Sequence, residues 1–437
     1  MKTYWLETYG CQMNKAESGS LEASLKANGW QPAESDTEAQ LVIINTCSVR
    51  KTAENRIWGR LGHFRSLKKK RSFQVALMGC MAERLKEEIR KYAPEIDFIV
   101  GTFQKLDFAK HITTSDNLSK AKQDFFDTKQ FQFSGSHITE NTFHAMVPIM
   151  HGCNNYCSYC IVPYVRGREI SRPIDNILEE VQTLISQGLK EITFLGQNVN
   201  SYHYQSGTAV YKFPDLLAEI TEQFDNDIWF RFVSSHPKDF LDELISVIAG
   251  DPRICNHIHL ALQHGSNSIL SQMNRKYTIE HYIERVQALR KAVPNASIST
   301  DLLVGFPGET DDDFRKTLEA VKTIRFNDAF TYKYNSREGT KAFDLGDTVP
   351  EPIKHERLQE LIDTQREIGH NLRENELGKT VKVLVEGTSK KNENELLART
   401  ERNEMVVFPG PKDLIGTFTS IVLETLNGTT FTGKEKV

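Results

Sequence analysis

Three cysteines near the middle of the 437-residue chain have the spacing of a metal-cluster loop. They are Cys153, Cys157 and Cys160, in a C-x3-C-x2-C arrangement that directly follows a predicted strand. Three thiolates hold three irons of a cubane [4Fe–4S] cluster and leave the fourth iron without a protein ligand. That iron is open to a small molecule with a free amine and carboxylate, such as S-adenosylmethionine (SAM). The loop therefore predicts a cluster that delivers an electron to a bound molecule.

Structural zinc is the alternative for this loop, because His151 would complete a tetrahedral Cys3His set. The downstream sequence favours the cluster. Polar or glycine-rich strings follow the later predicted strands, and in a βα barrel they would all face the same rim as the cysteine loop. These strings begin at Gly196, Ser234, Gln263 and Gly305.

Three further cysteines, Cys11, Cys47 and Cys80, each stand at the end of a predicted strand. In an open α/β sheet the carboxyl ends of the strands border the ligand crevice, so thiols about 35 residues apart would meet there. This set also offers three ligands and one open iron, which could bind and surrender sulfur. Three unrelated buried cysteines are the alternative. Cys255 has no partner spacing and is interpreted as a structural thiol.

A parallel sheet must position the second set of cysteines. Over the first ~110 residues, short β-rich runs alternate with helical patterns, which is the signature of a parallel sheet with crossover helices. The predicted strands cover residues 3–8, 41–46, 73–78 and 97–100, and the predicted helices cover 15–28, 49–69, 82–92 and 105–112. Residues 113–141 are polar without a sustained period and predict an interdomain connection.

The alternation resumes at residue 144 and places the cysteine loop in a second α/β unit. The predicted strands there cover residues 144–149, 191–195, 228–233, 257–262, 297–304 and 329–334. Six βα units in about 190 residues predict a partial barrel, because the eight-stranded form typically needs about 250. A helical connector over 354–376 then leads to predicted strands at 380–385, 395–399, 405–408 and 417–423, as in a small β-barrel.

Composition bounds the class of protein. Hydrophobic residues make up 39% of the chain and charged residues 26%, which predicts globular domains rather than disorder. No apolar run approaches the ~18 residues of a membrane helix, and the N-terminus lacks a signal-peptide pattern, so we expect a cytoplasmic protein. The net charge of −4 gives no global attraction to nucleic acid, so nucleic-acid binding would require a local basic patch.

One such patch lies between residues 50 and 71. Its basic residues, opposed by the single acid Glu54, are Arg50, Lys51, Arg56, Arg60, Arg65, Lys68, Lys69, Lys70 and Arg71. The run begins three residues after Cys47, which favours RNA contact beside the proposed cluster. A solvated helix face is the alternative, because most charge runs are solvated.

Six strings of the sequence match a known family: Thr8 to Asn14, Asn45 to Arg50 with Ala53-Glu54, Gly79 to Ala82, Cys153 to Pro163, Arg166 to Arg172 and Thr300 to Thr310. Through them the chain resembles, over essentially its whole length, the methylthiotransferase branch of the radical SAM enzymes, and most closely the MiaB-type tRNA methylthiotransferases. The resemblance implies an α/β fold class with an N-terminal parallel sheet domain, a central partial (βα)6 radical SAM barrel and a small C-terminal β-barrel, the TRAM domain. We expect these domains at 1–115, 143–373 and 374–437, with a linker at 116–142.

The resemblance also implies methylthiolation of carbon 2 of N6-isopentenyladenosine next to the tRNA anticodon. One SAM would methylate a sulfur on an auxiliary cluster, and another would yield the 5′-deoxyadenosyl radical that removes hydrogen from that carbon. By similarity, two [4Fe–4S] clusters would be held by Cys11, Cys47 and Cys80 and by Cys153, Cys157 and Cys160. The implied SAM contacts are Gly196, Gln197, Asn198, Ser234, Gly305 and Gly308, and the implied tRNA contacts are Arg50, Arg337 and Arg399. No catalytic side chain is assigned.

The implied partners are the tRNA anticodon stem-loop and an electron donor such as flavodoxin or ferredoxin, and we expect a monomer without membrane attachment. A loop base suits this chemistry because it can unstack and enter a pocket for a few kcal/mol. Two rival substrates are threonylcarbamoyladenosine in tRNA and an aspartate of a ribosomal protein, although the string after Cys47 favours isopentenyladenosine. The rival from another class is a non-catalytic metal-binding protein that binds RNA or carries sulfur, with zinc on its cysteines.

Overall fold

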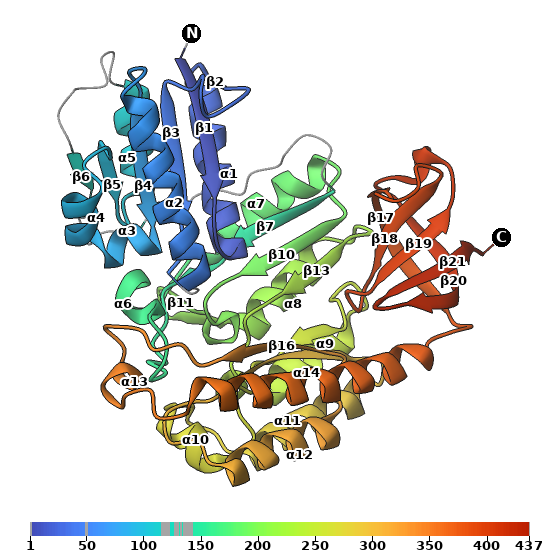
Figure 1. Ribbon diagram of the computed structural model, residues 1–437. Helices are drawn as coiled ribbons and strands as arrows, with labels where there is room; N and C mark the ends of the chain where they lie inside the picture. The colour runs from blue at the N-terminus through green and yellow to red at the C-terminus, as the bar shows by residue number, and fades with distance from the viewer. Residues whose placement is uncertain are drawn as a thin grey trace.

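The computed structural model describes residues 2–48, 51–114, 123–125, 131, 133 and 143–436. A parallel sheet flanked by helices, a larger α/β body and a small β-barrel follow one another along the chain (Figure 1). This architecture agrees with the fold class expected from the sequence. Within the described ranges, no helix has both the length and the apolar character needed to cross a membrane.

The N-terminal sheet is parallel throughout, with the strand order β2-β1-β3-β4-β5-β6. Its strands are β1 (Lys2–Thr8), β2 (Trp30–Pro32), β3 (Leu41–Thr46), β4 (Gln74–Gly79), β5 (Phe98–Val100) and β6 (Gln123–Phe125). Its helices are α1 (Gln12–Ala27), α2 (Lys51–Lys68), α3 (Cys80–Arg84), α4 (Lys86–Tyr92) and α5 (Lys105–Thr114). β2 and β6 were not predicted, because three residues are too few to show a period. β6 lies within the predicted linker, most of which falls outside the described residues.

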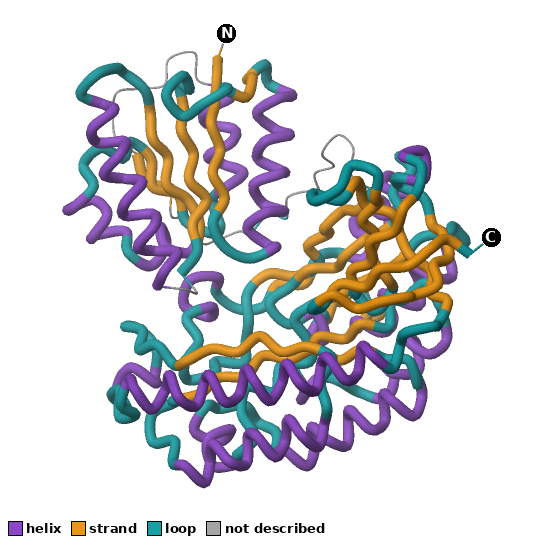
Figure 2. The backbone as a smooth tube through the Cα atoms, turned by 45° about the vertical axis from the view of Figure 1, so that its right-hand side comes forward, coloured by secondary structure: helices purple, strands orange, loops and turns teal. Residues whose placement is uncertain are grey.

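Alternation along β3 explains how this sheet is buried on both faces. Leu41 and Ile43 pack in the cluster that contains α1 and α5 side chains, whereas Val42 and Ile44 pack in the cluster that contains α2 side chains. Successive side chains point to opposite faces of a strand, so a strand covered on both faces must be apolar throughout. Figure 2 shows helices on both sides of these strands.

Six parallel strands form an open barrel in the middle of the chain. They pair in two groups, β7-β10-β13 and β14-β15-β16, which are joined by the bridges Phe230–Ile254 and Ser235–Leu260. The strands are β7 (His144–Pro148), β10 (Glu191–Leu195), β13 (Trp229–Phe232), β14 (His257–His259), β15 (Ser297–Val304) and β16 (Asp328–Lys333). The helices are α6 (Val162–Arg166), α7 (Ile174–Ser186), α8 (Phe213–Gln223), α9 (Asp242–Gly250), α10 (Asn267–Gln272), α11 (Ile279–Ala292), α12 (Asp311–Ile324), α13 (Lys341–Asp344) and α14 (Glu351–Glu374). Each strand overlaps its predicted position.

Two hairpins of this body were not predicted. β8 (Met150–His151) pairs with β9 (Ile170–Ser171), and β11 (His203–Ser206) pairs with β12 (Ala209–Lys212). Strands of two to four residues are too short for a readable alternation. The first hairpin joins the two ends of the cysteine loop and so closes that loop.

Five strands close the C-terminal barrel in the order β17-β18-β19-β21-β20. They are β17 (Thr380–Thr388), β18 (Glu395–Thr400), β19 (Met405–Pro409), β20 (Phe418–Asn427) and β21 (Thr430–Glu435). Four of them were predicted. β21 was missed because Gly433 and two charged residues interrupt its short apolar pattern.

The C-terminal barrel is anchored to the middle body through Arg231 of β13. Its guanidinium donates to the carbonyl oxygens of Thr400 and Glu401, each at 2.7 Å, and its Nε lies 2.7 Å from Oε2 of Glu191. Cys255 is buried in an apolar cluster at the same junction, which agrees with its interpretation as a structural thiol.

Candidate active site

The thiols of Cys11, Cys47 and Cys80, called here the auxiliary trio, come together because three neighbouring strands end at one edge. β3 pairs with β1 on one side and β4 on the other, and Thr46 lies opposite Gly79. Cys47 follows β3, Cys80 begins α3, and Cys11 is the residue that caps α1. Parallel pairing therefore delivers the three side chains to the same edge of the sheet.

Two glycines allow the strand ends to approach so closely. Gly10 has φ +124°, and a Cβ at this position would lie 2.7 Å from the Cβ of Cys47. Gly79 has φ +95°, and its Cβ would lie 2.6 Å from the carbonyl oxygen of Thr46. L side chains rarely adopt such φ values. Neither position has room for a side chain, so both glycines are needed for this arrangement of the thiols.

Cys153, Cys157 and Cys160, called here the loop trio, lie on one turn of chain between β8 and β9. A Cβ on Gly152 would lie 2.0 Å from a backbone oxygen in the returning segment, so the two ends of the loop are in contact. Nη1 of Arg275 donates to the sulfur of Cys157 at 3.2 Å. The loop is therefore held in place by the surrounding barrel as well as by its own hairpin.

All six of these cysteines line one cavity of about 410 Å³ between the N-terminal sheet and the barrel. In the described part of the chain, no three His, Cys, Asp or Glu side chains are close enough to hold a single metal ion. A cubane does not require such convergence, because each of its three thiolates binds a different iron. The cavity thus has the donor set for two clusters, one from each body, that face a common space.

Three of the six residues predicted to contact SAM also line this cavity, namely Gly196, Gln197 and Ser234. Asn198 is buried behind the wall. Its Nδ2 donates to Oδ2 of Asp239 at 2.7 Å, and its Oδ1 accepts from the backbone N–H of His236 at 3.1 Å. Asn198 therefore fixes the loops that follow β10 and β13 instead of facing the cavity.

Gly305 and Gly308 are not brought to this cavity. A Cβ on Gly305 would lie 2.4 Å from Cγ of Lys354, so this glycine lets α14 pack against the barrel. The backbone N–H of Gly308 donates to Oγ1 of Thr348 at 2.7 Å. Gly305 therefore serves packing here, and the SAM contacts expected at these two positions remain predictions.

Several buried polar atoms in the cavity wall have no partner. Among the described residues, Oδ1 of Asn155, Oε1 of Gln197, Oγ of Ser235 and Nε2 of His236 have no hydrogen-bond partner, and all four residues line the cavity. Leaving a buried polar group unpaired costs about 1–3 kcal/mol. These atoms fit a ligand with both donors and acceptors, such as the amino and carboxylate groups of SAM.

Backbone strain is found at the same place. Tyr156, Ser234 and Gln263 have φ values of 48°, 70° and 73°, which side-chain-bearing residues rarely adopt. Ser234 and Gln263 line the cavity, and Tyr156 lies within the loop trio. Such residues cost about 1–3 kcal/mol each and cluster at sites that are preorganised for a ligand.

Burial raises the pKa of several of these thiols. It raises the pKa of Cys153 to about 11 and, together with the neighbouring Cys157, the pKa of Cys160 to about 12. It also raises the pKa of Cys80. Because iron binds the thiolate, metal binding must release protons from these groups.

Two buried arginines, Arg166 and Arg275, face the thiols, and the sequence analysis assigned a role to neither. Both line the cavity, with 2% and 4% of their surface exposed. Burial acts to lower the pKa of each, but nearby acidic groups outweigh it and hold the pKa well above its usual range. Arg166 begins one of the strings that resemble the family, whereas nothing in the local sequence marks Arg275.

The three arginines predicted to contact tRNA have different positions. Arg337 lines an adjoining cavity of about 540 Å³ that shares Cys160 with the first, and its guanidinium lies 3.7 Å from Oε1 of Glu54. Arg399 lies in β18, where its Nε donates to Oε1 of Glu386 at 2.6 Å. Arg50 lies outside the described residues.

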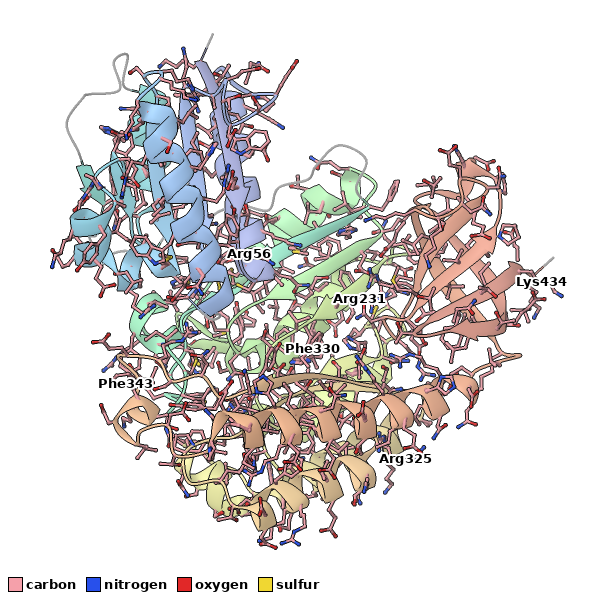
Figure 3. The ribbon with its side chains drawn as sticks, viewed as in Figure 1. Arg56, Arg231, Arg325, Phe330, Phe343 and Lys434 are labelled. Atoms are coloured by element: carbon pink, nitrogen blue, oxygen red, sulfur yellow. The ribbon has the colours of Figure 1, made fainter. Side chains whose placement is uncertain are left out.

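Several basic residues of the run between residues 50 and 71 form ion pairs within the N-terminal domain. Its ion pairs are Arg60 with Glu7 and Asp36, Arg65 with Glu95, and Lys68 with Asp97. The carboxylates come from distant parts of the sequence, so the run is opposed in space by more than Glu54. Arg56 is exposed on the same helix (Figure 3). These ion pairs leave less of the run available to RNA than the sequence alone indicates.

His151, the fourth ligand in the zinc alternative, does not reach the loop trio. It is buried, stacks on Phe131 with ring centroids 3.8 Å apart, and has its Nδ1 3.4 Å from Nη1 of Arg166. It is not part of the cavity wall. Burial and the adjacent Arg166 hold the pKa of His151 well below its usual range. A Cys3His set is therefore not assembled.

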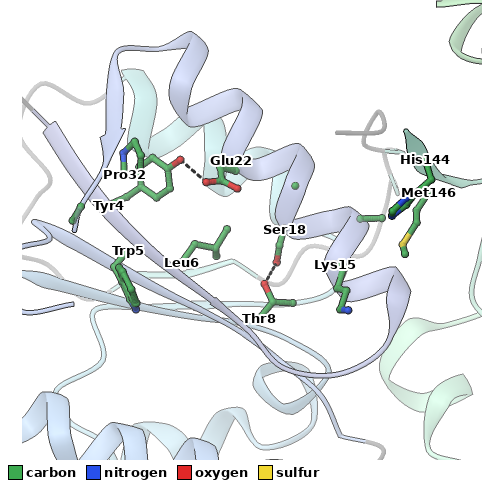
Figure 4. A pocket seen from close by; sticks show the side chains of 13 residues that line it. Tyr4, Trp5, Leu6, Thr8, Lys15, Ser18, Glu22, Pro32, His144 and Met146 are labelled. Carbon is green, nitrogen blue, oxygen red and sulfur yellow. Dashed lines mark hydrogen bonds between the residues drawn. The ribbon is translucent and has the colours of Figure 1, made fainter. Parts of the chain in front are cut away.

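A separate cavity of about 440 Å³ lies where β1 and α1 meet β7 (Figure 4). Two pairs of its polar side chains bond to each other. The hydroxyl of Tyr4 donates to Glu22 at 2.9 Å, and that of Thr8 donates to Ser18 at 2.8 Å. No cysteine is among the described residues that line it. This cavity offers none of the donors found between the two trios.

Comparison with known families gives three matches along the chain. Residues 147–321 match the radical SAM superfamily, residues 374–433 match the TRAM domain, and residues 3–101 match a family described as "Uncharacterized protein family UPF0004". The auxiliary trio lies within the third match and the loop trio within the first.

Close relatives cover the whole chain. A tRNA-2-methylthio-N(6)-dimethylallyladenosine synthase of Treponema denticola is 49% identical, over 98% of this chain and 99% of the relative. Relatives of the same name are 46% identical in Treponema pallidum, over 98% of this chain and 97% of the relative, and 41% in Desulfitobacterium hafniense, over 98% and 96%.

Solved structures share the fold at low identity. The radical SAM methyltransferase TsrM of Kitasatospora setae superposes with a TM-score of 0.56 at 14% identity, over 76% of this chain and 72% of TsrM. The cobalamin-dependent radical SAM enzyme OxsB gives a TM-score of 0.51 at 12% identity, over 84% of this chain and 58% of OxsB. At these identities the likeness extends to the fold alone.

Proposed function

The chain belongs to the tRNA-2-methylthio-N6-dimethylallyladenosine synthases of the radical SAM superfamily, and we propose that it attaches a methylthio group to carbon 2 of N6-isopentenyladenosine next to the tRNA anticodon. It is a radical SAM tRNA methylthiotransferase. The superfamily uses SAM and a [4Fe–4S] cluster. The number of clusters, their ligands and the substrate pocket are the parts that we propose.

The observation that carries this proposal is the meeting of two cysteine trios in one cavity. The loop trio would hold the cluster that binds SAM, and the auxiliary trio would hold a second [4Fe–4S] cluster. When bound, the two clusters and SAM supply the electron, the radical source, the methyl group and the sulfur. A radical must react before it is quenched, so both reacting groups need to face the same base.

The remaining wall of the cavity supports SAM as the ligand of the loop trio. Gln197 and Ser235 present unpaired buried oxygens that can accept from an amino group. Gly196 lies in the same wall, where the absence of a side chain makes room for Met150, because a Cβ there would lie 2.4 Å from Cγ of Met150. These residues would bind and orient SAM, and they exclude water from the space beside the thiols.

The TRAM domain and the opening beside Arg337 would hold the tRNA. Arg337 and Arg399 are the described arginines that we propose for RNA contact; Arg50 remains a prediction from the resemblance. An anticodon-loop base can leave its stack and enter a pocket, which a base within a duplex cannot do at comparable cost. We also propose a cytoplasmic monomer, served by an electron donor such as flavodoxin or ferredoxin, with domains at 1–115, 143–373 and 374–437.

Nucleoside analysis tests the substrate. We expect that a strain without the gene loses 2-methylthio-N6-isopentenyladenosine from its tRNA and accumulates N6-isopentenyladenosine, with recovery when the gene is restored. Unchanged methylthio-isopentenyladenosine would contradict the proposal. Loss of the methylthio form of threonylcarbamoyladenosine instead would identify the rival substrate in tRNA.

Metal analysis tests the clusters independently of the substrate. The protein purified without oxygen is expected to be brown and to contain about eight irons per chain, as two four-iron cubanes require. A colourless protein that contains zinc would support the non-catalytic alternative.

A further inference from the structure

A buried network of side chains connects the two cysteine trios, and no role described above accounts for it. Its centre is Arg166, the last residue of α6, the helix that directly follows the loop trio. Nη1 of Arg166 donates to Oε1 of Glu17 at 2.8 Å, and Nη2 donates to Oδ1 of Asn14 at 2.8 Å. Both acceptors lie on α1 of the N-terminal domain. The guanidinium thus joins the barrel to the helix that begins just after Cys11.

Asn14 extends this link to the strand ends of the auxiliary trio. Its Nδ2 donates to the carbonyl oxygen of Tyr9 at 2.9 Å and to that of Thr46 at 2.8 Å. These carbonyls lie just before Cys11 and Cys47, respectively. Oδ1 of Asn14, which accepts from Arg166, also lies 3.6 Å from the sulfur of Cys11. Asn14 therefore ties two of the three auxiliary ligands to one arginine of the barrel.

The same network places positive charge beside the auxiliary trio. Lys105 of α5 forms an ion pair with Glu17, so the carboxylate is shared by two cations, Arg166 and Lys105. All three side chains are at least nine-tenths buried. Their formal charges sum to +1, and a buried charge requires compensation. A cluster held by the three thiolates of the auxiliary trio would be anionic and would supply the compensation that the protein side chains leave incomplete.

We propose that Asn14 and Arg166 form a clamp that sets the position of the auxiliary cluster relative to the SAM-binding cluster, and that Arg166 stabilises the negative charge of the auxiliary cluster. The inference rests on the proposed function only in that both trios hold clusters. Asn14 and Arg166 are positioning residues, because they act on ligand-bearing loops. Lysine cannot replace Arg166 fully, since one ammonium does not reproduce the two-pronged contact with Asn14 and Glu17.

Redox titration tests the charge component. The auxiliary cluster is observed alone when Cys153, Cys157 and Cys160 are replaced by alanine in the full chain. In that background, Arg166→Gln is expected to shift the midpoint potential of the cluster to more negative values, because a neighbouring positive charge favours the reduced, more anionic form. Arg166→Lys should leave the potential near that of the parent. Arg168→Gln is the matched control, since it removes an exposed arginine from the same segment.

Pulsed electron paramagnetic resonance tests the positioning component in the chain with both clusters. The distance between the reduced clusters is expected to be sharply distributed in the parent and broadened in Arg166→Lys and Asn14→Ala. Disturbing a residue that orients metal ligands typically costs about 10- to 100-fold in activity, so we expect a loss of this size in methylthio product per SAM cleaved. Arg168→Gln should change neither the distribution nor this ratio.

Two results would overturn the clamp. The first is that Arg166→Gln binds iron fully and keeps both the midpoint potential and the distance distribution of the parent. The second applies if Arg166→Gln fails to bind iron: an Arg166→Lys protein with eight irons and an unchanged distance distribution would show that the contact does not position the cluster. If the parent holds two clusters yet does not modify isopentenyladenosine, the proposed function fails while both physical measurements remain valid tests of the clamp.

Discussion

The two cysteine trios differ in how the chain brings their thiols together. The loop trio spans eight residues of continuous sequence, closed by the β8–β9 hairpin. The auxiliary trio has no local connection, and it exists only where β1, β3 and β4 end side by side. The spacing of the loop trio is therefore set by one short segment, which the barrel then holds in place, whereas the auxiliary trio depends on the register of a whole sheet.

The largest expected effects come from removing one ligand of each trio. We expect Cys157→Ala to abolish SAM cleavage, because SAM would bind to the cluster of the loop trio. Cys47→Ala should retain SAM cleavage but stop insertion of the methylthio group. The measurements are 5′-deoxyadenosine and modified nucleoside formed by the anaerobic protein with reductant and an anticodon stem-loop RNA.

Cys255→Ala is the matched control for both variants, because Cys255 is buried but belongs to neither trio. It should leave both products unchanged. If Cys157→Ala and Cys47→Ala both lose SAM cleavage while folded and while Cys47→Ala keeps the loop cluster, the division of labour between the trios is wrong.

A methyl group added at Gly10 should affect the auxiliary trio and leave the loop trio unchanged. In Gly10→Ala the added Cβ would displace Cys47, and the positive φ adds strain of about 1–3 kcal/mol. We expect the iron content to fall by about half, with SAM cleavage kept. Gly29→Ala is the control, because Gly29 has φ +81° and an added Cβ there would meet no atom of the described structure within 4 Å beyond its chain neighbours. It should carry the strain without the loss of iron, and an equal loss in both variants would count against a role for the contact with Cys47.

The junction with the TRAM domain provides a test at a distance from both trios. In Arg231→Met the buried carboxylate of Glu191 loses its partner. Breaking a buried ion pair in this way lowers the free energy of unfolding by about 3–5 kcal/mol. Chemical unfolding should report this loss, and RNA binding should weaken, while the iron content stays at the parental value. Lys382→Gln breaks an exposed pair with Asp227 at the same junction and should cost about 1 kcal/mol or less. A loss of iron in Arg231→Met would show that the trios are not insulated from this junction.

The remaining expected effect is a pH dependence of stability that arises at Glu17, beside the auxiliary trio. Burial acts to raise the pKa of Glu17, but Arg166 and Lys105 outweigh it and lower the pKa to about 2. Because the pKa is lower in the folded chain, this carboxylate stabilises the fold above its unfolded pKa near ~4.3, and the contribution is lost as the pH falls towards 2. The difference corresponds to about 3 kcal/mol.

Urea unfolding of the metal-free protein between pH 5 and pH 3 measures this contribution. Glu17→Gln should flatten the fall in unfolding free energy over this range, whereas the exposed control Glu34→Gln should not. The same slope in Glu17→Gln and the parent would remove Glu17 as the source of the pH dependence.

The contrast between local and assembled sites also explains what sequence patterns could predict. The longer strands of both α/β bodies could be predicted, because a continuous apolar run such as Leu41–Thr46 marks a buried strand whatever its partners are. The cysteines were predicted from their spacing and from their places at strand ends. β2 and β6 were missed because their pairing within the sheet, and not their three-residue patterns, makes them strands.

Features that depend on partners distant in sequence were predicted poorly. Arg166 and Asn14 are 152 residues apart, and no local pattern indicates that they meet. The basic run suggested an RNA surface because Glu7 and Glu95, which neutralise part of it, lie far away in the chain. Gly305 and Gly308 form a string that resembles a ligand loop, yet the space beside Gly305 is filled by Lys354 of α14.

The pairing of Glu17 with Arg166 has a consequence for the order of events during synthesis. Every strand of the N-terminal sheet has been translated by residue 125, but the arginine that neutralises Glu17 is made some forty residues later. Until then, Lys105 is the only one of the two described ion-pair partners of Glu17 that has been made. The first domain to leave the ribosome therefore completes its charge pairing only when the helix after the loop trio has been made.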